Sequence, residues 1–173
     1  MSTPHIVIAG GGYVGMYTAL GLQKQLRPDE AHITLVDPRS AMTYQPFLPE
    51  AAAGSLEPRH VVVPLRKTLA GCDVITARVT SIDCAERTLR VEPLEGTPYE
   101  LRFDQLVVAL GSVARTLPIP GLAEHGLGFK QIEEAISLRN HILDRLDVAA
   151  SVQDPATRHK ALTFVFVGGG YAG

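Results

Sequence analysis

The feature that most constrains this chain is a short apolar run that leads directly into a glycine-rich turn. Gly10, Gly12 and Gly15 have the spacing G-x-G-x-x-G. In this spacing the first glycine allows a tight turn out of a strand, and the second lets backbone N–H groups approach a pyrophosphate. The third lets the following helix lie close to the strand. The turn therefore predicts a strand–loop–helix unit whose helix N-terminus faces phosphate groups.

The residues on both sides of the turn supply the context that this motif needs. Apolar positions at helical spacing predict a helix over Tyr13–Leu26, and His32–Asp37 has the character of a second strand. Asp37 follows the last glycine by about 20 residues, where a carboxylate accepts hydrogen bonds from an adenosine ribose. Tyr13 and Val14, in the first helical turn, are predicted to lie with the glycines against the phosphates. The motif alone does not distinguish FAD from NAD as the ligand. The negative charge of Asp37 disfavours NADP, because it would repel the 2′-phosphate.

Other kinds of glycine-rich turn fit less well. A Walker phosphate loop needs Lys and then Ser or Thr where this chain has Met16 and Tyr17. A kinase glycine loop leads into a strand rather than a helix. A doubly wound domain that keeps its glycine turn only for packing, without a nucleotide, is the alternative that the residues leave open.

The chain after this unit predicts an α/β fold with a small β insertion. Tyr44–Gly54 is expected to be an extended loop followed by a short helical turn that Gly54 caps. Pro64–Leu69 is expected to be a short helix with Pro64 at its first position. Leu106–Leu110 has the continuous apolar character of a buried parallel strand. Further strands are predicted at Asp73–Ile82, Thr88–Val91 and Tyr99–Phe103.

The last residues repeat the first motif. Val7–Gly15 aligns without a gap with Val165–Gly173, so that Gly168, Gly170 and Gly173 are predicted to bind a second nucleotide. A helix over Ile132–Val148 and a strand over Leu162–Val167 are expected before this second turn. The chain stops at the third glycine of the copy, and we therefore expect it to be an N-terminal fragment.

Composition narrows the classes of function. A net charge of −2 gives no electrostatic reason to expect a nucleic-acid partner. No apolar stretch reaches the length of a membrane span, which favours a cytoplasmic protein. The two cysteines, Cys72 and Cys84, have no CxxC spacing and no histidine nearby, so we expect neither a metal site nor a disulfide framework.

The motifs together resemble the N-terminal part of the two-dinucleotide flavoproteins of the pyridine nucleotide-disulphide oxidoreductase type. Within these the chain is most similar to the type II (alternative) NADH:quinone oxidoreductases. The disulfide-reductase branch, which carries a cysteine pair after its first βαβ unit, is a poor match because no cysteine precedes Cys72. The matching segments are Ile8–Gly15, Ile33–Asp37, Tyr44–Gly54, Pro64–Arg66, Asp104–Ser112 and the second glycine turn at Gly168.

This resemblance implies two domains. Residues 1–118 would form a Rossmann-like FAD-binding domain with a parallel sheet and the β insertion. Residues 119–173 would supply a connecting helix and the first elements of a truncated Rossmann-like NADH-binding domain. Such an enzyme transfers hydride from NADH to FAD and passes electrons to a quinone, and this chain alone would have little activity.

The resemblance also assigns residues to the adenosine half of FAD. Asp37 would meet the ribose and Arg39 the neighbouring adenosine. The strand near Val79 would contact the adenine through its backbone.

A second set of residues is assigned to the flavin half. Thr43 and Pro46, within the segment from Thr43 to Phe47, would lie beside the isoalloxazine ring, and Ala109 and Gly111 would approach it. The family usually has the motif Ala-Thr-Gly at these positions. In this chain Leu110 replaces the threonine of that motif. No catalytic acid–base residue is assigned, because hydride transfer between the two cofactors requires none.

Other functions remain open at this stage. The same fold would serve a sulfide:quinone or ferredoxin-type reductase, and a non-catalytic FAD-binding module is an alternative of another class. The resemblance further implies NADH and quinone as substrates and allows a homodimer. It also allows peripheral association with the cytoplasmic face of a membrane through later parts of such proteins.

Overall fold

The computed structural model describes residues 3–27 and 29–169. The chain divides into two compact units. Residues 1–43 and 63–113 form the first unit, and residues 44–62 and 114–173 form the second. The sequence-based boundary after residue 118 stays a prediction.

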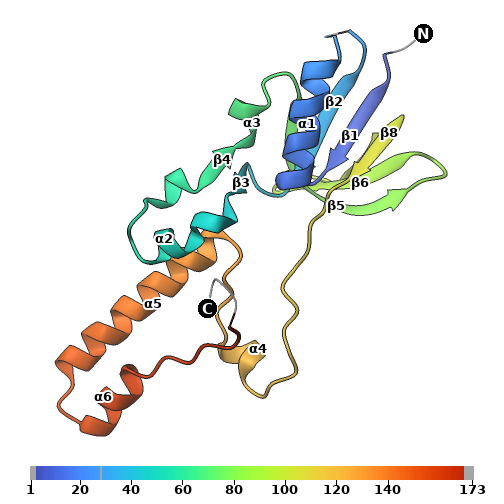
Figure 1. Ribbon diagram of the computed structural model, residues 1–173. Coiled ribbons are helices and arrows are strands. Elements are labelled where there is room, and N and C mark those ends of the chain that lie inside the picture. The colour runs from blue at the N-terminus through green and yellow to red at the C-terminus, as the bar shows by residue number, and fades with distance from the viewer. Residues whose placement is uncertain (1–2, 28, 170–173) are drawn as a thin grey trace. The chain divides into compact units, whose positions relative to one another are not determined.

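The first unit is built on one six-stranded sheet in the order β7-β6-β5-β2-β1-β8. Neighbours among β5, β2, β1 and β8 pair in parallel, whereas β6 pairs antiparallel with both β5 and β7. This mainly parallel α/β fold with a small antiparallel insertion is the predicted class (Figure 1). The strands are β1 (His5–Ala9), β2 (His32–Asp37), β5 (Asp73–Asp83), β6 (Thr88–Pro93), β7 (Tyr99–Arg102) and β8 (Gln105–Val108).

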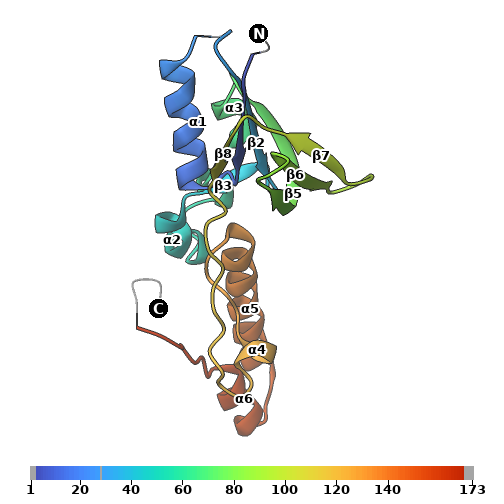
Figure 2. The same cartoon turned by 90° about the vertical axis from the view of Figure 1, so that its right-hand side faces the viewer.

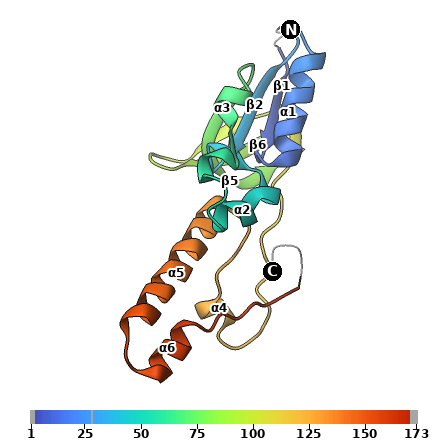
Figure 3. The same ribbon diagram turned by 60° about the vertical axis from the view of Figure 1, so that its left-hand side comes forward.

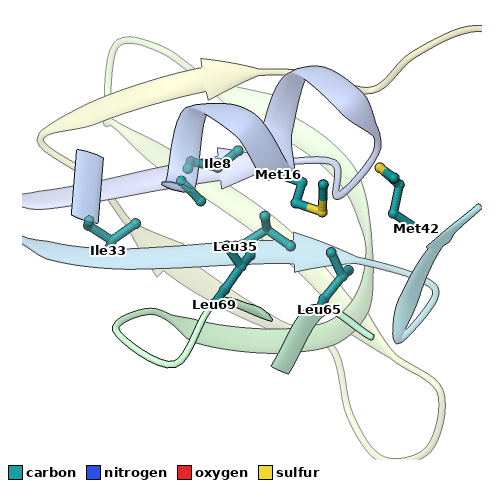
Figure 4. Close-up of a cluster of buried hydrophobic side chains, with 8 residues drawn as sticks. Ile8, Met16, Ile33, Leu35, Met42, Leu65 and Leu69 are labelled. Atoms are coloured by element: carbon teal, nitrogen blue, oxygen red, sulfur yellow. The ribbon is translucent and has the colours of Figure 1, made fainter. Parts of the chain in front are cut away.

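Helix α1 (Tyr13–Gln25) covers one face of this sheet. Side chains alternate between the two faces of a strand, so Ile33 and Leu35 of β2 share the face that α1 covers. Figure 4 shows Met16 of α1 above Leu35, with Leu65 and Leu69 closing the same cluster. These side chains are almost fully buried. Burial of this apolar surface fixes α1 against β1 and β2.

The opposite face of the sheet is covered by the antiparallel insertion. Val7 and Val36, the neighbours of the residues that face α1, pack there with Leu89 and Val91 of β6 and with Phe103. Figure 2 shows α1 on one side of the strands, with β6 and β7 extending away from the other. Both faces of β1 and β2 are therefore buried, which explains their continuous apolar sequence.

The prediction for the last strand of the sheet was partly wrong. The parallel pairing of β8 with β1 is confirmed. However, the strand covers Gln105–Val108 rather than Leu106–Leu110, and it forms the edge of the sheet. No described strand covers its outer side, so Val108 and Leu110 are 58% and 60% exposed.

Short elements between β2 and β5 were not fully predicted. β3 (Ala41–Thr43) and β4 (Val62–Pro64) form a two-stranded sheet. Helix α3 (Leu65–Thr68) follows, and Pro64 is its N-cap rather than its first residue. The reason is that Pro64 has an extended backbone, with ψ of 117°, and closes β4. Three-residue strands carry too little periodicity to be found from sequence.

The second unit is helical in its described residues. Leu48, Ala51 and Val61 pack with Ile132 and Ala135 in a buried cluster, which holds α2 against the start of α5 (Figure 3). Gly54, with φ of +80°, follows α2 as the predicted cap. The elements are η1 (Gln45–Phe47), α2 (Leu48–Ala52), η2 (Pro58–His60), α4 (Leu122–His125), α5 (Ile132–Ser151) and α6 (Pro155–Ala161).

Side-chain caps explain where α5 and α6 begin. Glu134 Oε2 accepts hydrogen bonds from the N–H groups of Lys130 and Gln131, at 2.6 and 2.9 Å. At α6, the carboxylate of Asp154 accepts from Thr157 N at 2.8 Å, and Pro155 occupies the first turn. Each contact satisfies an N–H group near the helix start that has no intrahelical acceptor.

The strand predicted over Leu162–Val167 does not form. These residues have no regular structure, and Val165 and Phe166 are 82% and 71% exposed. A strand needs a partner for its backbone hydrogen bonds. In the described part of the second unit no residue after Val62 is in a strand. The sequence therefore has the apolar pattern of a strand, but the described residues of the second unit offer no sheet with which it could pair.

Candidate functional site

The glycine turn lies at the carboxyl end of β1, between β2 and β8. Gly10 N donates a hydrogen bond to Val36 O at 2.8 Å, and Ala109 N donates to Ala9 O at 2.8 Å. Gly10 has φ of +109°, and a Cβ at this position would overlap the carbonyl of Ala109. The first glycine is therefore needed both for its backbone conformation and for the passage of the chain after β8.

The other two glycines of the motif differ in their surroundings. A Cβ at Gly15 would overlap the carbonyl oxygen of Gly10, so this glycine lets α1 lie directly on the turn. Gly12 is the N-cap of α1 and is exposed, and a Cβ there would meet nothing within 4 Å. Open space above Gly12, at the N-terminus of a helix, is what a bound pyrophosphate requires.

Asp37 closes the site at the end of β2. Its Oδ2 accepts a hydrogen bond from Gly11 N at 2.7 Å, and its Oδ1 accepts from Arg39 N at 2.7 Å. The carboxylate is only partly buried. Asp37 thus holds the glycine turn and the segment after β2 at once, and a carboxylate can accept further hydrogen bonds through its remaining lone pairs.

The structure brings together most of the residues predicted in the first unit. Tyr13 and Val14 are in the first turn of α1 and are 36% and 65% exposed. Ala109 contacts the turn through its backbone, and Gly111 follows with φ of +70°. These residues surround the carboxyl ends of β1, β2 and β8, where open α/β sheets bind ligands.

Val79 lies on β5, beyond the residues of that strand that pair with β2. The pairing of β5 with β6 shifts register between Val79 and Ser81, so that Thr80 has no Cα partner on β6. Such bulges interrupt the ladder and are common beside active sites. The proposed backbone contact from this strand to adenine stays a prediction.

Of the remaining predicted residues, Arg39 meets the site only through its backbone N–H, which donates to Asp37 Oδ1. Arg39 is exposed and Thr43 is buried at the end of β3, both in the first unit. Pro46 and Gly168 belong to the second unit, where Gly168 has φ of +123°. Their contacts with a flavin or with NADH stay predictions. Gly170 and Gly173 lie outside the described residues.

Sequence reasoning missed two contributors. Gly11 is buried and donates to Asp37, and a Cβ there would lie 2.6 Å from Leu65 Cδ1, so that Leu65 would have to shift. The x positions of the motif carry no signal for this packing. Arg66, in the first turn of α3, reaches across to β5 and was not assigned to the site.

The fold and this cradle define a dinucleotide-binding domain of the Rossmann type. Its strand–glycine turn–helix, with an acidic residue at the end of the second strand, offers a helix N-terminus to phosphates and a carboxylate to a ribose. The chain belongs to the pyridine nucleotide-disulphide oxidoreductase family, whose model matches residues 4–173.

Curated relatives of the chain include quinone-reducing enzymes. Demethylphylloquinone reductase NdbB of Synechocystis is 34% identical over 178 residues, covering 98% of this chain and 41% of the relative. A type II NADH:quinone oxidoreductase of Staphylococcus epidermidis is 34% identical over 171 residues, covering 97% of this chain and 40% of the relative. The chain therefore spans about two fifths of the length of these proteins.

Solved structures agree with the fold. NDH2 of Plasmodium falciparum, solved in complex with NADH, superposes with a TM-score of 0.82 at 23% identity. The match covers 91% of this chain and 32% of that protein. The sulfide:quinone oxidoreductase of Aquifex aeolicus superposes with a TM-score of 0.69 at 26% identity, covering 83% of this chain and 32% of that one.

No group of three or more His, Cys, Asp or Glu side chains in residues 3–27 and 29–169 could hold a metal ion. Over the same ranges, no helix combines the length and the apolar character that crossing a bilayer demands.

Proposed function

We propose that the chain is the FAD-holding part of an NADH:quinone oxidoreductase. The observation that carries the proposal is the cradle at β1 and β2, where Gly12 leaves open space and Asp37 presents a carboxylate beside it. The names of the Synechocystis and Staphylococcus relatives support a quinone as the electron acceptor, and the second name supports NADH as the donor.

The residues of the first unit fit the adenosine diphosphate part of FAD. The first-turn N–H groups of α1 would face the pyrophosphate, because they have no acceptor within the helix. Gly12 would let the phosphates approach the backbone, and Asp37 would accept hydrogen bonds from the ribose hydroxyls. Ala109 and Gly111 would continue toward the flavin ring. Bound FAD supplies the hydride and electron chemistry, and the protein supplies binding and orientation.

The proposal also assigns roles to Thr43, Pro46 and the second glycine turn. Thr43 and Pro46 would lie beside the isoalloxazine ring, and Gly168, Gly170 and Gly173 would face the NADH pyrophosphate. The resemblance and the repeated motif support these assignments.

Ligand titration tests the first part of the proposal. We expect the chain to bind FAD more tightly than NADH, measured by flavin fluorescence and by competition with NADH. Gly12→Val should abolish binding, because its side chain would fill the open space. Gly21→Ala, in the same helix but away from its N-terminus, is the matched control and should bind FAD normally. Tighter binding of NADH than of FAD at this site would contradict the proposal.

The electron acceptor is tested in a polypeptide of the relatives' length that contains this chain. Steady-state oxidation of NADH with a soluble quinone is the expected activity. Sulfide oxidation in place of NADH oxidation would assign the protein to the sulfide:quinone type. FAD binding without either activity would identify a binding module.

A further inference from the structure

Arg66 is held in a defined position on the sheet. Its Nη2 donates hydrogen bonds to Val74 O at 3.1 Å and to Thr76 Oγ1 at 2.9 Å. Arg66 belongs to α3, whereas both acceptors belong to β5. Two acceptors at one end of a planar guanidinium restrict its rotation, so the group is ordered before any ligand arrives.

This position is beside Asp37. Thr76 is the Cα partner of Asp37 in the parallel pairing of β2 with β5. Partners on neighbouring strands point to the same face of a sheet and are separated by about 4.8 Å. Leu35 and Val74, two residues earlier on each strand, both pack in the cluster under α1, which identifies that shared face. The guanidinium therefore lies on the Asp37 side of the sheet, at the same level.

Among the described residues, no acidic side chain forms an ion pair with Arg66. The ion pairs among the described residues join Arg27 to Glu30, His32 to Asp73 and Arg59 to Glu57. Arg66 is exposed, and its hydrogen bonds to Val74 and Thr76 both use Nη2. The guanidinium thus lies on the same side of the sheet as the Asp37 carboxylate without forming an ion pair with it.

The order of the strands indicates which part of a bound dinucleotide would lie next to Arg66. Along the carboxyl edge, β1 ends at the phosphate-binding turn and β2 ends at the ribose-binding carboxylate. The next group of a dinucleotide in this direction is the base, and the next strand is β5. A guanidinium stacks well on the face of an aromatic ring, whereas an ammonium does so less well.

We propose that Arg66 is part of the adenine subsite, with its guanidinium against the face of the base and Thr76 as its positioning residue. This inference rests on the proposed FAD site and adds to it a residue that selects for the purine end of the ligand. FMN and riboflavin, which lack adenosine, would make no use of it.

The experiment is a set of titrations of the full chain with three probes: FAD, ADP and FMN. Arg66→Met keeps the apolar stem and removes the plane and the charge, and it should weaken FAD and ADP about threefold to thirtyfold. Affinity for FMN should not change. Lys67→Met, the neighbouring exposed cation, is the matched control and should bind all three probes as the parent does.

Two further variants separate positioning from general damage. Arg66→Lys should remain folded and recover only part of the affinity for ADP, because a lysine cannot stack as a plane. Thr76→Val should weaken ADP less than Arg66→Met does, and adding it to Arg66→Met should cause no further loss, as residues that act through one another are not additive. Circular dichroism verifies the fold of each variant.

The outcomes distinguish this inference from the proposed function. A parent chain that binds neither FAD nor ADP overturns both. A parent that binds both, with equal affinities in a folded Arg66→Met variant, overturns the adenine subsite alone. Equal weakening of FAD, ADP and FMN also overturns it, because the effect would then not follow the adenosine.

Discussion

The carboxylate of Asp37 accepts a hydrogen bond from the backbone N–H of Gly11, with 2.7 Å between Oδ2 and N. The residue proposed to bind ribose therefore also fixes the glycine turn, across 26 positions of sequence. The other carboxylate oxygen of Asp37, Oδ1, accepts a hydrogen bond from Arg39 N. Loss of the carboxylate must affect both the stability of the turn and the affinity for the ligand.

Asp37→Ala should weaken FAD binding about tenfold to a hundredfold, because hydrogen bonds to a charged acceptor are worth roughly 1.5–3 kcal/mol. It should also lower the free energy of unfolding, because Gly11 N loses its partner. Asp37→Asn keeps one oxygen and should recover part of both. Fluorescence titration and chemical denaturation measure the two effects, with Glu100→Gln, an exposed acid on β7, as the control. Unchanged FAD affinity in Asp37→Ala would remove Asp37 from the site.

Substitution by alanine should lower FAD affinity at Gly12 and stability at Gly15. Gly12→Ala places its methyl group in open space and should leave the melting temperature unchanged while lowering FAD affinity. Gly15→Ala drives a methyl group into the carbonyl of Gly10 and should cost about 1–3 kcal/mol of stability. Thermal unfolding without ligand, followed by FAD titration, compares them. The site is misassigned if Gly12→Ala binds FAD like the parent.

Gly21→Ala should stabilise the chain. A glycine inside a helix costs up to about 1 kcal/mol relative to alanine. A Cβ at Gly21 would meet nothing within 4 Å, so no close packing on the sheet explains this residue. The free energy of unfolding should rise by about 0.5–1 kcal/mol. A decrease would show that α1 shifts toward the sheet at this point.

The stability of the first unit should fall in mild acid because of His5. Burial lowers the pKa of His5 below its ordinary value of 6.5, and His32 adds to the effect against the opposing influence of Arg102, Asp104 and Asp73. The unfolded chain therefore binds this proton more readily than the folded one. The contribution to stability is complete above pH 6.5 and is lost as the pH falls toward the lowered pKa.

Chemical denaturation between about pH 5 and pH 8 measures this dependence. His5→Gln should flatten the acid limb, whereas His141→Gln, an exposed histidine on α5, should leave it as in the parent. An acid limb of the same slope in His5→Gln would assign the pH dependence to other groups.

The two cysteines should differ in reactivity. Burial raises the pKa of the Cys72 thiol above 9.0, despite a hydrogen bond with Gln23 that acts in the opposite direction. Cys84 is exposed. Because the thiolate is the reacting form, a thiol reagent at about pH 8 should modify Cys84 first and Cys72 slowly. Cys84→Ser should remove the fast phase. Equal rates for both thiols would show that the region around Cys72 opens readily.

The fold was predictable where local pattern and tertiary role coincide. β2 has its predicted bounds, because a strand buried on both faces is apolar throughout. Leu162–Val167 has the same pattern but forms no strand, since pairing depends on a partner that no local pattern reveals. The edge position of β8 was missed for the same reason.

The positions of Gly10, Gly12, Gly15 and Asp37 were predictable, because the motif ties each of them to a fixed spacing. Gly11 and Arg66 were not, because their importance depends on Leu65, Thr76 and the pairing of β2 with β5. The spacing of residues in the sequence does not indicate that Arg66 of the short helix α3 contacts the following strand, β5. Such contacts appear only when the strands are placed in order.

The pairing of β1 with β8 also has a consequence for biosynthesis. His5 N donates to Asp104 across 99 positions, and Gly10 packs on the backbone of Ala109. A growing polypeptide cannot complete the glycine turn until residues beyond Ala109 have left the ribosome, although the turn itself is made earlier. Until then β1 has one edge unpaired, and an unpaired strand edge is prone to association with other chains.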